Sequence, residues 1–251
     1  MSGISHSNTH LIHYYECDQQ QNLTLPMLVN LLLHVSGEHS EELGLSDDVL
    51  AGRDLSWVII QYEMHIKRLP QFKETIKIET IARQYNKLFS YRDFFVKDEQ
   101  GNTIIEVCVT FGLISLSKRK LVRLPENIME PYGAEFSKSL VRTPRPQKVD
   151  IDKAQKRSYH VRYFDIDRNK HVNNSKYLEW TLDALDADFL NQHQLTYATM
   201  KFEKEVLYDE KVESLASMEK IDEQFYVTNH HIKSGEQINF TASYNWKAKG
   251  E

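Results

Sequence analysis

The chain carries a weak internal duplication, and this feature limits what it can fold into. The segment HYYECDQQQNLTLPML from His13 aligns with RYFDIDRNKHVNNSKYL from Arg162, an offset of 149 residues. The matched positions are Tyr14 with Tyr163, Tyr15 with Phe164, Glu16 with Asp165 and Asp18 with Asp167. Two similar segments in one chain predict two similar folding units.

A helical pattern follows each copy. In the first, Thr24 is a candidate N-cap, and apolar residues recur at helical spacing at Leu25, Leu28, Leu32 and Val35. In the second, Asn173 or Asn174 can cap a stripe formed by Leu178, Leu182, Leu185 and Phe189. We expect these helices to end near Gly44 and around Asn191.

Strand-like stretches come after each helix. The first half contains WVIIQYEMHIKRL, ETIKIETIA and a hairpin turning at Gln100-Gly101-Asn102. The second contains ATMKFEKEVLY, EKVESLASMEK and a hairpin turning at Ser234-Gly235. One amphipathic helix per antiparallel sheet predicts an α+β fold in which a strongly curved sheet wraps each long helix. We expect domains at 1–124 and 157–251, joined by a proline-rich linker at 125–156.

Composition excludes several classes of protein. The 251 residues are 41% hydrophobic and have a formal net charge of −5, which gives no reason to expect nucleic acid as a partner. The first ten residues lack the pattern of a signal peptide, and no stretch approaches the roughly 18 apolar residues of a membrane span. Cys17 and Cys108 form no metal-binding or redox motif, so we expect a soluble cytoplasmic protein without membrane insertion.

The segment DRNKHVNNSKYLEW resembles the signature D-x-N-x-H-V-N-N-x-K-Y-x-x-W of the acyl-acyl carrier protein thioesterases. The stretches LSWVI, RLPQFKETIKIET and KFEKEV also resemble that family. The resemblance implies a double hotdog fold, a fatty acyl thioester substrate on an acyl carrier protein, no cofactor and the catalytic residues Asp167, Asn169, His171 and Glu205. Plant members often have cysteine directly after the glutamate, whereas this chain has Val206, so no thiol stands there to attack.

Thioester hydrolysis needs a polarised carbonyl and an attacking group, and the thiolate leaves readily because a thiol has a pKa of about 8.5. If residues 167–171 are extended, Asp167, Asn169 and His171 point to one side, beside the start of the following helix. We expect Glu205 to come from a buried position on the first strand of the second sheet. Two mechanisms stay open: water attack with Glu205 as base, or direct attack by Asp167 to form an anhydride.

The duplication provides an internal control. Asp18 matches Asp167, but Asn169 faces Gln20 and His171 faces Asn22. The strands align at a smaller offset of about 136, which places Leu69 opposite Glu205. We therefore expect one active site per chain, with the first half carrying a degenerate site and supplying an apolar slot for the acyl tail.

Other functions are compatible with the same residues. An acyl-CoA thioesterase of hotdog type is the main alternative, and a non-catalytic acyl-thioester-binding protein is a further one. A metal ion held by Asp165, Asp167 and His171 is conceivable, although the chemistry does not require it. Asp165 could also be a surface or structural residue.

Two basic segments could dock an acidic carrier protein, or could simply be solvated. The first comprises Lys138, Arg142, Arg145, Lys148, Lys153, Lys156 and Arg157, and the second comprises Lys118, Arg119, Lys120 and Arg123. A monomer and a homodimer are both compatible with two fused units.

Overall fold

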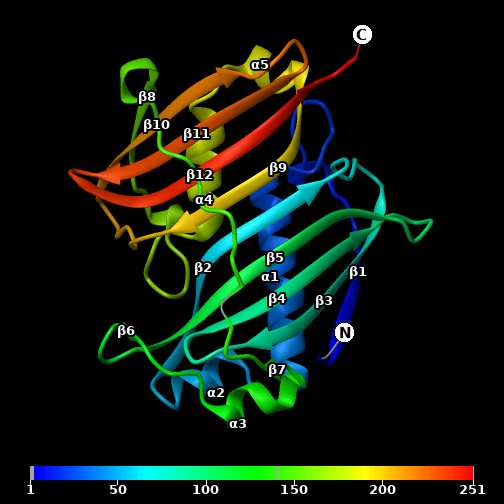
Figure 1. Cartoon of the computed structure of the whole chain (residues 1–251), viewed down its shortest axis with the longest axis vertical. Helices are drawn as coiled ribbons and strands as arrows, with labels where there is room; N and C mark the ends of the chain where they lie inside the picture. The colour runs from blue at the N-terminus through cyan, green and yellow to red at the C-terminus, as the bar shows by residue number, and fades with distance from the viewer. Residues whose placement is uncertain (1–2, 140, 251) are drawn as a thin grey trace.

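One continuous, mostly antiparallel sheet runs through both halves of the chain in the computed structural model, which describes residues 3–139 and 141–250 (Figure 1). The first-half strands are β1 Ser5–Leu11, β2 Leu55–Ile66, β3 Thr75–Tyr85, β4 Phe89–Lys97, β5 Thr103–Ser115, β6 Lys120–Leu121 and β7 Glu135–Phe136. The second-half strands are β8 Gln155–His160, β9 His193–Phe202, β10 Lys211–Lys220, β11 Phe225–Ser234 and β12 Gln237–Ala248. Both predicted hairpins, β4–β5 and β11–β12, are confirmed.

The strand order shows the duplication in space. It reads β1-β3-β4-β5-β2 and then β9-β12-β11-β10-β8, so the second half repeats the first in reverse. The two halves meet where β2 pairs with β9, from Gln61 opposite Lys201 to His65 opposite Tyr197. The central strand pair therefore joins both units by backbone hydrogen bonds rather than by side chains alone.

Each half packs a helix against the concave side of the sheet (Figure 1). α1 spans Leu25–Glu42; the Thr24 hydroxyl accepts from the Met27 amide at 3.4 Å, and Gly44 follows the helix with φ +70°, as expected. α4 spans Asn174–Asp183 with Asn173 as its cap. The shorter helices are α2 Asp47–Ala51, α3 Glu126–Met129 and α5 Ala187–Gln192, with 3₁₀ turns η1 Tyr14–Glu16, η2 Glu130–Tyr132, η3 Ile151–Lys153 and η4 Tyr163–Asp165.

The prediction of one second-half helix reaching about Asn191 is wrong. α4 ends at Asp183, and α5 begins a new helix after extended backbone at Asp186. Leu185 is buried at this break, and its amide donates to the Leu182 carbonyl at 3.0 Å in a tighter turn. Asp183 and Asp186 stand on either side of the break, and aspartate favours caps and turns over helix interiors. The apolar stripe alone therefore predicted a helix that is too long.

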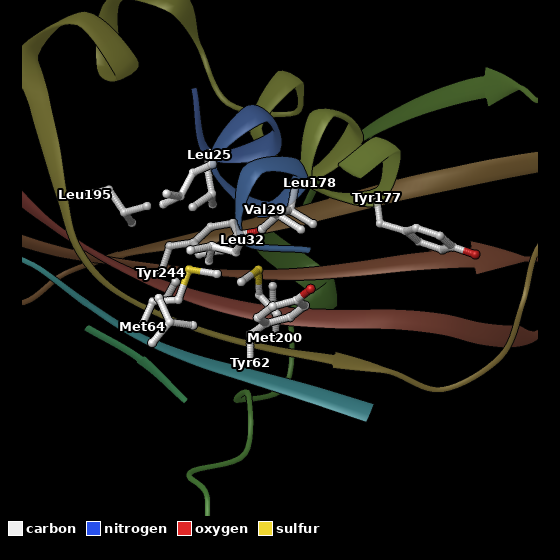
Figure 2. Packing of buried hydrophobic residues seen from close by; sticks show 14 of the residues in the cluster. Leu25, Val29, Leu32, Tyr62, Met64, Tyr177, Leu178, Leu195, Met200 and Tyr244 are labelled. Carbon is white, nitrogen blue, oxygen red and sulfur yellow. The ribbon is translucent and has the colours of Figure 1, made fainter. Parts of the chain in front are cut away.

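The main core is shared by the two halves. Leu32 of α1 and Leu178 of α4 pack with Tyr62 and Met64 of β2 and Met200 of β9, all fully buried (Figure 2). A smaller cluster at the far end of α1 contains Leu50, Leu113, Ile128, Met129 and Tyr132. None of the helices in residues 3–139 and 141–250 has both the length and the apolar character needed to cross a bilayer.

Residues 125–156 are more structured than a free linker. The segment contributes Ile128, Met129 and Tyr132 to the smaller core cluster and then crosses the outer face of the sheet (Figure 1). There the Pro144 carbonyl accepts hydrogen bonds from Gln61 of β2 and Thr199 of β9, one residue from each half. The connecting segment thus bridges the central strand pair.

Candidate active site

Residues 167–171 form a tight turn, so the condition of an extended backbone does not hold here. The Lys170 amide donates to the Asp167 carbonyl at 3.0 Å, the Asp167 amide donates to the His171 carbonyl at 2.9 Å, and Lys170 has φ +64°. The Asp167 carboxylate accepts from the Asn169 amide at 2.8 Å, which is the geometry of an Asx turn. A carboxylate used in this way closes the turn.

The same turn exists in the first half. The Asp18 carboxylate accepts from the Gln20 amide at 2.8 Å, the Asp18 amide donates to the Asn22 carbonyl at 2.9 Å, and Gln21 has φ +66°. The backbone therefore matches at the offset of 149 residues. Since Asp18 makes this bond in a half without the histidine, the bond alone is no sign of catalysis.

The structure brings His171 and Glu205 together. His171 Nε2 lies 3.2 Å from Glu205 Oε2. The Val172 amide donates to the Val206 carbonyl at 3.0 Å, and this bond holds the two segments side by side. Its counterpart in the first half runs from the Leu23 amide to the Pro70 carbonyl at 2.8 Å. The smaller offset of 136 therefore also holds in space.

Glu205 is neither on a strand nor buried, and both expectations are wrong. β9 ends at Phe202, and the side chain of Glu205 is 45% exposed. The amides of Glu203 and Lys204 both donate to the Asn239 carbonyl, at 2.8 and 3.1 Å, so the chain leaves the regular ladder before Glu205. The carboxylate is thereby placed at the rim of a cavity.

Arg119 is a site residue that the sequence reasoning assigned only to a basic segment. It belongs to the first half, has φ +53°, and forms an ion pair with Glu205 across the two halves. Its Nη2 also lies 2.9 Å from His171 Nε2. Because a guanidinium only donates, this contact requires the neutral ring with its proton on Nδ1, whereas a bond from His171 to Glu205 requires the proton on Nε2.

These side chains line a cavity of about 390 Å³ between the halves. The second half contributes the motif residues Asp167, Asn169, His171, Asn173 and Asn174, together with Tyr177 and Glu205. The first half contributes Leu33, Ser36, Gly37 and Ser40 of α1, with Trp57, Ile59 and Phe111 of the sheet. Asn173 accepts from the Ser175 amide at 2.9 Å, so α4 begins at the cavity wall.

A larger cavity, of about 990 Å³, lies beside the equivalent turn of the first half and is also lined by second-half residues such as Leu190, His193 and Trp246. Its wall includes Asp18, Gln20, Asn22 and Leu69, the counterparts of Asp167, Asn169, His171 and Glu205. Side-chain amides of Gln19 and Gln20 donate across it to Asn191, at 2.8 and 2.9 Å. At the positions equivalent to His171 and Glu205 the larger cavity has Asn22 and Leu69, so the candidate catalytic pair lies in the smaller cavity.

Asp165 is structural. Its side chain is 1% exposed and accepts from the Arg162 backbone amide at 2.9 Å and from the Arg162 guanidinium. Burial opposes its charge, but these bonds and the charge of Arg162 outweigh burial and lower the pKa of Asp165. Among the described residues, no three His, Cys, Asp or Glu side chains are grouped so that they could hold a metal ion. The hypothesis of a metal held by Asp165, Asp167 and His171 therefore has no geometric support.

A long helix wrapped by a curved antiparallel sheet, repeated in reverse order around a shared strand pair, is the double hotdog fold, as predicted. The family model for the acyl-ACP thioesterase N-terminal domain matches residues 3–132, and that for the C-terminal domain matches residues 148–248. The chain belongs to the acyl-ACP thioesterase family.

Several known proteins are similar to it. A crystal structure from Lactobacillus plantarum, provisionally described as an oleoyl thioesterase, is 31% identical with a TM-score of 0.96 and covers 99% of this chain and 98% of that one. The 12:0-ACP thioesterase from Umbellularia californica shares the fold, at 22% identity and a TM-score of 0.87, covering 98% and 94%. An oleoyl-acyl carrier protein thioesterase of Coriandrum sativum is 26% identical over 90% of this chain, which spans 66% of that relative's length.

Proposed function

We propose that this protein hydrolyses fatty acyl-acyl carrier protein thioesters to free fatty acid and holo-acyl carrier protein. One observation carries the proposal: His171 and Glu205 lie 3.2 Å apart in a cavity that begins at the start of α4 and continues over apolar side chains of the first half. The membership of the family supports the thioester substrate. A cavity with a few convergent polar groups and an apolar extension suits an acyl thioester.

The chemistry needs only side chains and water. Water attacks the carbonyl carbon while Glu205 takes its proton, and the oxyanion is stabilised by the Asn174 amide at the start of α4 and by Asn169. Collapse breaks the carbon–sulfur bond, and the departing thiolate receives the proton through His171. Arg119 forms an ion pair with Glu205, so we expect its guanidinium to move aside before the carboxylate takes a proton from water.

Asp167 closes the turn that places Asn169 and His171 on the cavity wall, and we assign it this positioning role rather than nucleophilic attack. A single turnover in ¹⁸O-labelled water separates the two mechanisms. Direct water attack places the label in the fatty acid, whereas an anhydride on Asp167 that water opens at the aspartyl carbon places it in the enzyme carboxylate. An anhydride that water opens at the acyl carbon also labels the fatty acid, and it is distinguished by trapping the acyl group on Asp167. Recovery of an acyl group on Asp167 would overturn the assignment.

The division of labour follows the duplication. We assign acyl-chain binding to residues 1–124, catalysis to residues 157–251 and the connection to residues 125–156. Two features support this assignment: the apolar cavity wall comes from α1, β2 and β5, and the motif comes from the second half. Arg119 is the exception, because it reaches the motif from the first half.

We propose that the carrier protein docks on the second basic segment. Lys118, Lys120 and Arg123 are exposed and flank Arg119, which lines the cavity. In the other segment, Lys153, Lys156 and Arg157 already pair with Asp150, Glu213 and Asp183. A cytoplasmic location is a further proposal, supported by the unpaired thiols of Cys17 and Cys108, and a homodimer is a prediction for solution measurements.

The decisive test is hydrolysis of acyl-carrier thioesters from C8 to C18 beside the matching acyl-CoA thioesters. His171→Ala and Glu205→Gln should each lower kcat about 100-fold or more, because general acid–base groups contribute roughly 10²–10⁴. Asn22→Ala changes the counterpart of His171 and should leave kcat within twofold. A preference for CoA thioesters, or equal losses in Asn22→Ala and His171→Ala, would contradict the proposal.

A further inference from the structure

A buried arginine lies in the first half, next to the residues that line the candidate active-site cavity. Arg92 of β4 is 5% exposed. Burial lowers the pKa of Arg92 to about 10, which still leaves the guanidinium protonated at neutral pH. The fold therefore holds a permanent positive charge beneath α1.

The partners of Arg92 are all neutral. Nη1 donates to His39 Nδ1 at 2.9 Å and to the Thr80 hydroxyl at 3.2 Å, and the guanidinium lies 5.0 Å from the centre of the Tyr132 ring. Burial, together with the charges of Arg92 and His6, lowers the pKa of His39 to about 4, so its ring is uncharged at neutral pH. No carboxylate of the described residues forms an ion pair with Arg92. A buried cation without a counter-ion is costly in free energy, so its presence here needs an explanation.

The guanidinium faces a small polar chamber of about 20 Å³. Ser90, Arg92 and Tyr132 form its inner wall. Its other lining residues, Ser36, Ser40, Trp57 and Phe111, also line the candidate active-site cavity. The chamber is thus the inner end of the same channel and has room for about one water-sized atom.

The chamber offers unused donors. A guanidinium has five N–H groups, and both hydrogen bonds that Arg92 makes to described residues come from Nη1. An unsubstituted hydrocarbon end would give these donors no acceptor, and a buried donor without an acceptor is destabilising. An oxygen atom of the guest would satisfy them.

We propose that the channel is built for acyl chains that carry an oxygen, as a hydroxyl or an oxo group, near the distal end, and that this oxygen accepts a hydrogen bond from Arg92. The inference rests on the proposed function, because it names the substrate class of that site. Trp57 and Phe111 line both the cavity with the reacting groups and the chamber, so the chamber lies at a fixed place along the channel, and the position of the oxygen along the acyl chain is selected as well as its presence.

The test compares matched carrier thioesters of C6 to C14 chains, plain or with one hydroxyl on the last, second-last or third-last carbon. At one chain length and position, the parent protein should favour the hydroxylated substrate at least 10-fold in kcat/KM. Arg92→Met, which keeps the bulk and removes the donors, should abolish this preference while plain substrates are still hydrolysed.

Calorimetry on the parent with free hydroxylated and plain fatty acids gives a second readout that needs no variant, in case Arg92→Met does not fold. The hydroxylated acid of the preferred length should bind at least 10-fold more tightly. The proposal fails if no hydroxylated chain is favoured by more than threefold, or if Arg92→Met keeps the preference. Hydrolysis of neither substrate by the parent would instead reject the proposed function itself.

Discussion

Residues that differ between the two copies mark the chemistry better than residues that match. Asp18 and Asp167 make the same bond in the same turn, and Glu16 and Asp165 are both buried beside a 3₁₀ turn. His171 replaces Asn22 and Glu205 replaces Leu69, and these replacements create a histidine–carboxylate pair in the wall of the smaller cavity. Matched polar residues are accounted for by folding.

Asp165 gives a prediction about pH and stability. Asp165→Asn should lower the free energy of unfolding by about 1–3 kcal/mol at pH 7, because Arg162 and its amide lose a charged acceptor. The folded pKa of Asp165 is lowered, so its contribution is present above the unfolded value of about 3.9 and is lost as pH falls through the folded value.

Urea denaturation of parent and variant at pH 7 and pH 3 measures this difference. It should be largest at pH 7 and shrink in acid. Glu219→Gln, at an exposed carboxylate, is the control and should change stability by less than about 0.5 kcal/mol at either pH. A difference that stays constant from pH 7 to pH 3 would show that the charge of Asp165 is irrelevant.

At this scale the sequence predicted His171 and Glu205 as partners, and the structure places them in contact. Arg119 was not predicted as a site residue, because nothing in the sequence around it indicates a contact with Glu205, 86 residues away. Its left-handed backbone, unusual for a residue with a Cβ, is visible only in coordinates.

At the level of elements, the two long helices differ in how firmly each is capped. Thr24 accepts one bond from the Met27 amide at 3.4 Å, whereas Asn173 accepts from both the amide and the hydroxyl of Ser175, each at 2.9 Å. α1 has 18 residues and α4 has 10. The shorter helix depends more on its cap and also begins at the reactive cavity.

The caps form a matched pair of variants. Thr24→Ala and Asn173→Ala should each cost about 0.5–2 kcal/mol of stability, with Asn173→Ala the larger, as measured by thermal unfolding. Only Asn173→Ala should also lower kcat, because the first turn of α4 faces the substrate. Equal kinetic losses in both variants would mean that capping acts on the whole fold rather than on the site.

Apolar periodicity predicted the long helices and the inner strands, whose burial follows the same spacing. It did not predict β1 and β8, since SHSNTHL and QKRSYH consist mostly of polar residues and show no alternation of apolar and polar side chains. Apolar periodicity also wrongly extended the second helix beyond Asp183, because apolar residues can keep a helical spacing across a break in the backbone. Edges and interruptions depend on tertiary neighbours that a local pattern does not contain.

For the whole molecule, the central strand pair makes the two halves one cooperative unit. β2 and β9 share both backbone bonds and the buried cluster that contains Met64 and Met200. Unfolding in urea should therefore be a single transition, coincident by tryptophan fluorescence and circular dichroism. Two separated transitions would show that each half is stable without the other.

The proposed docking of a carrier protein depends on charges at the surface of the molecule. Lys118→Glu with Lys120→Glu should lower kcat/KM for acyl-carrier substrate about 10-fold at low salt, and the loss should shrink as salt screens the charges. Lys138→Glu with Arg142→Glu, in the other basic segment, is the charge-matched control. Equal losses in both double variants, or none in the first, would contradict docking at Lys118 and Lys120.

Joining the halves through β2 and β9 determines how copies of this protein can meet. In a single unit, the free edge of β2 or of β9 could pair with a strand of another molecule. In this chain the two strands pair with each other, so neither edge is free. The outermost strands, β1 and β8, are short and polar, which discourages lateral growth. We therefore expect any homodimer to be built from side-chain contacts elsewhere on the surface.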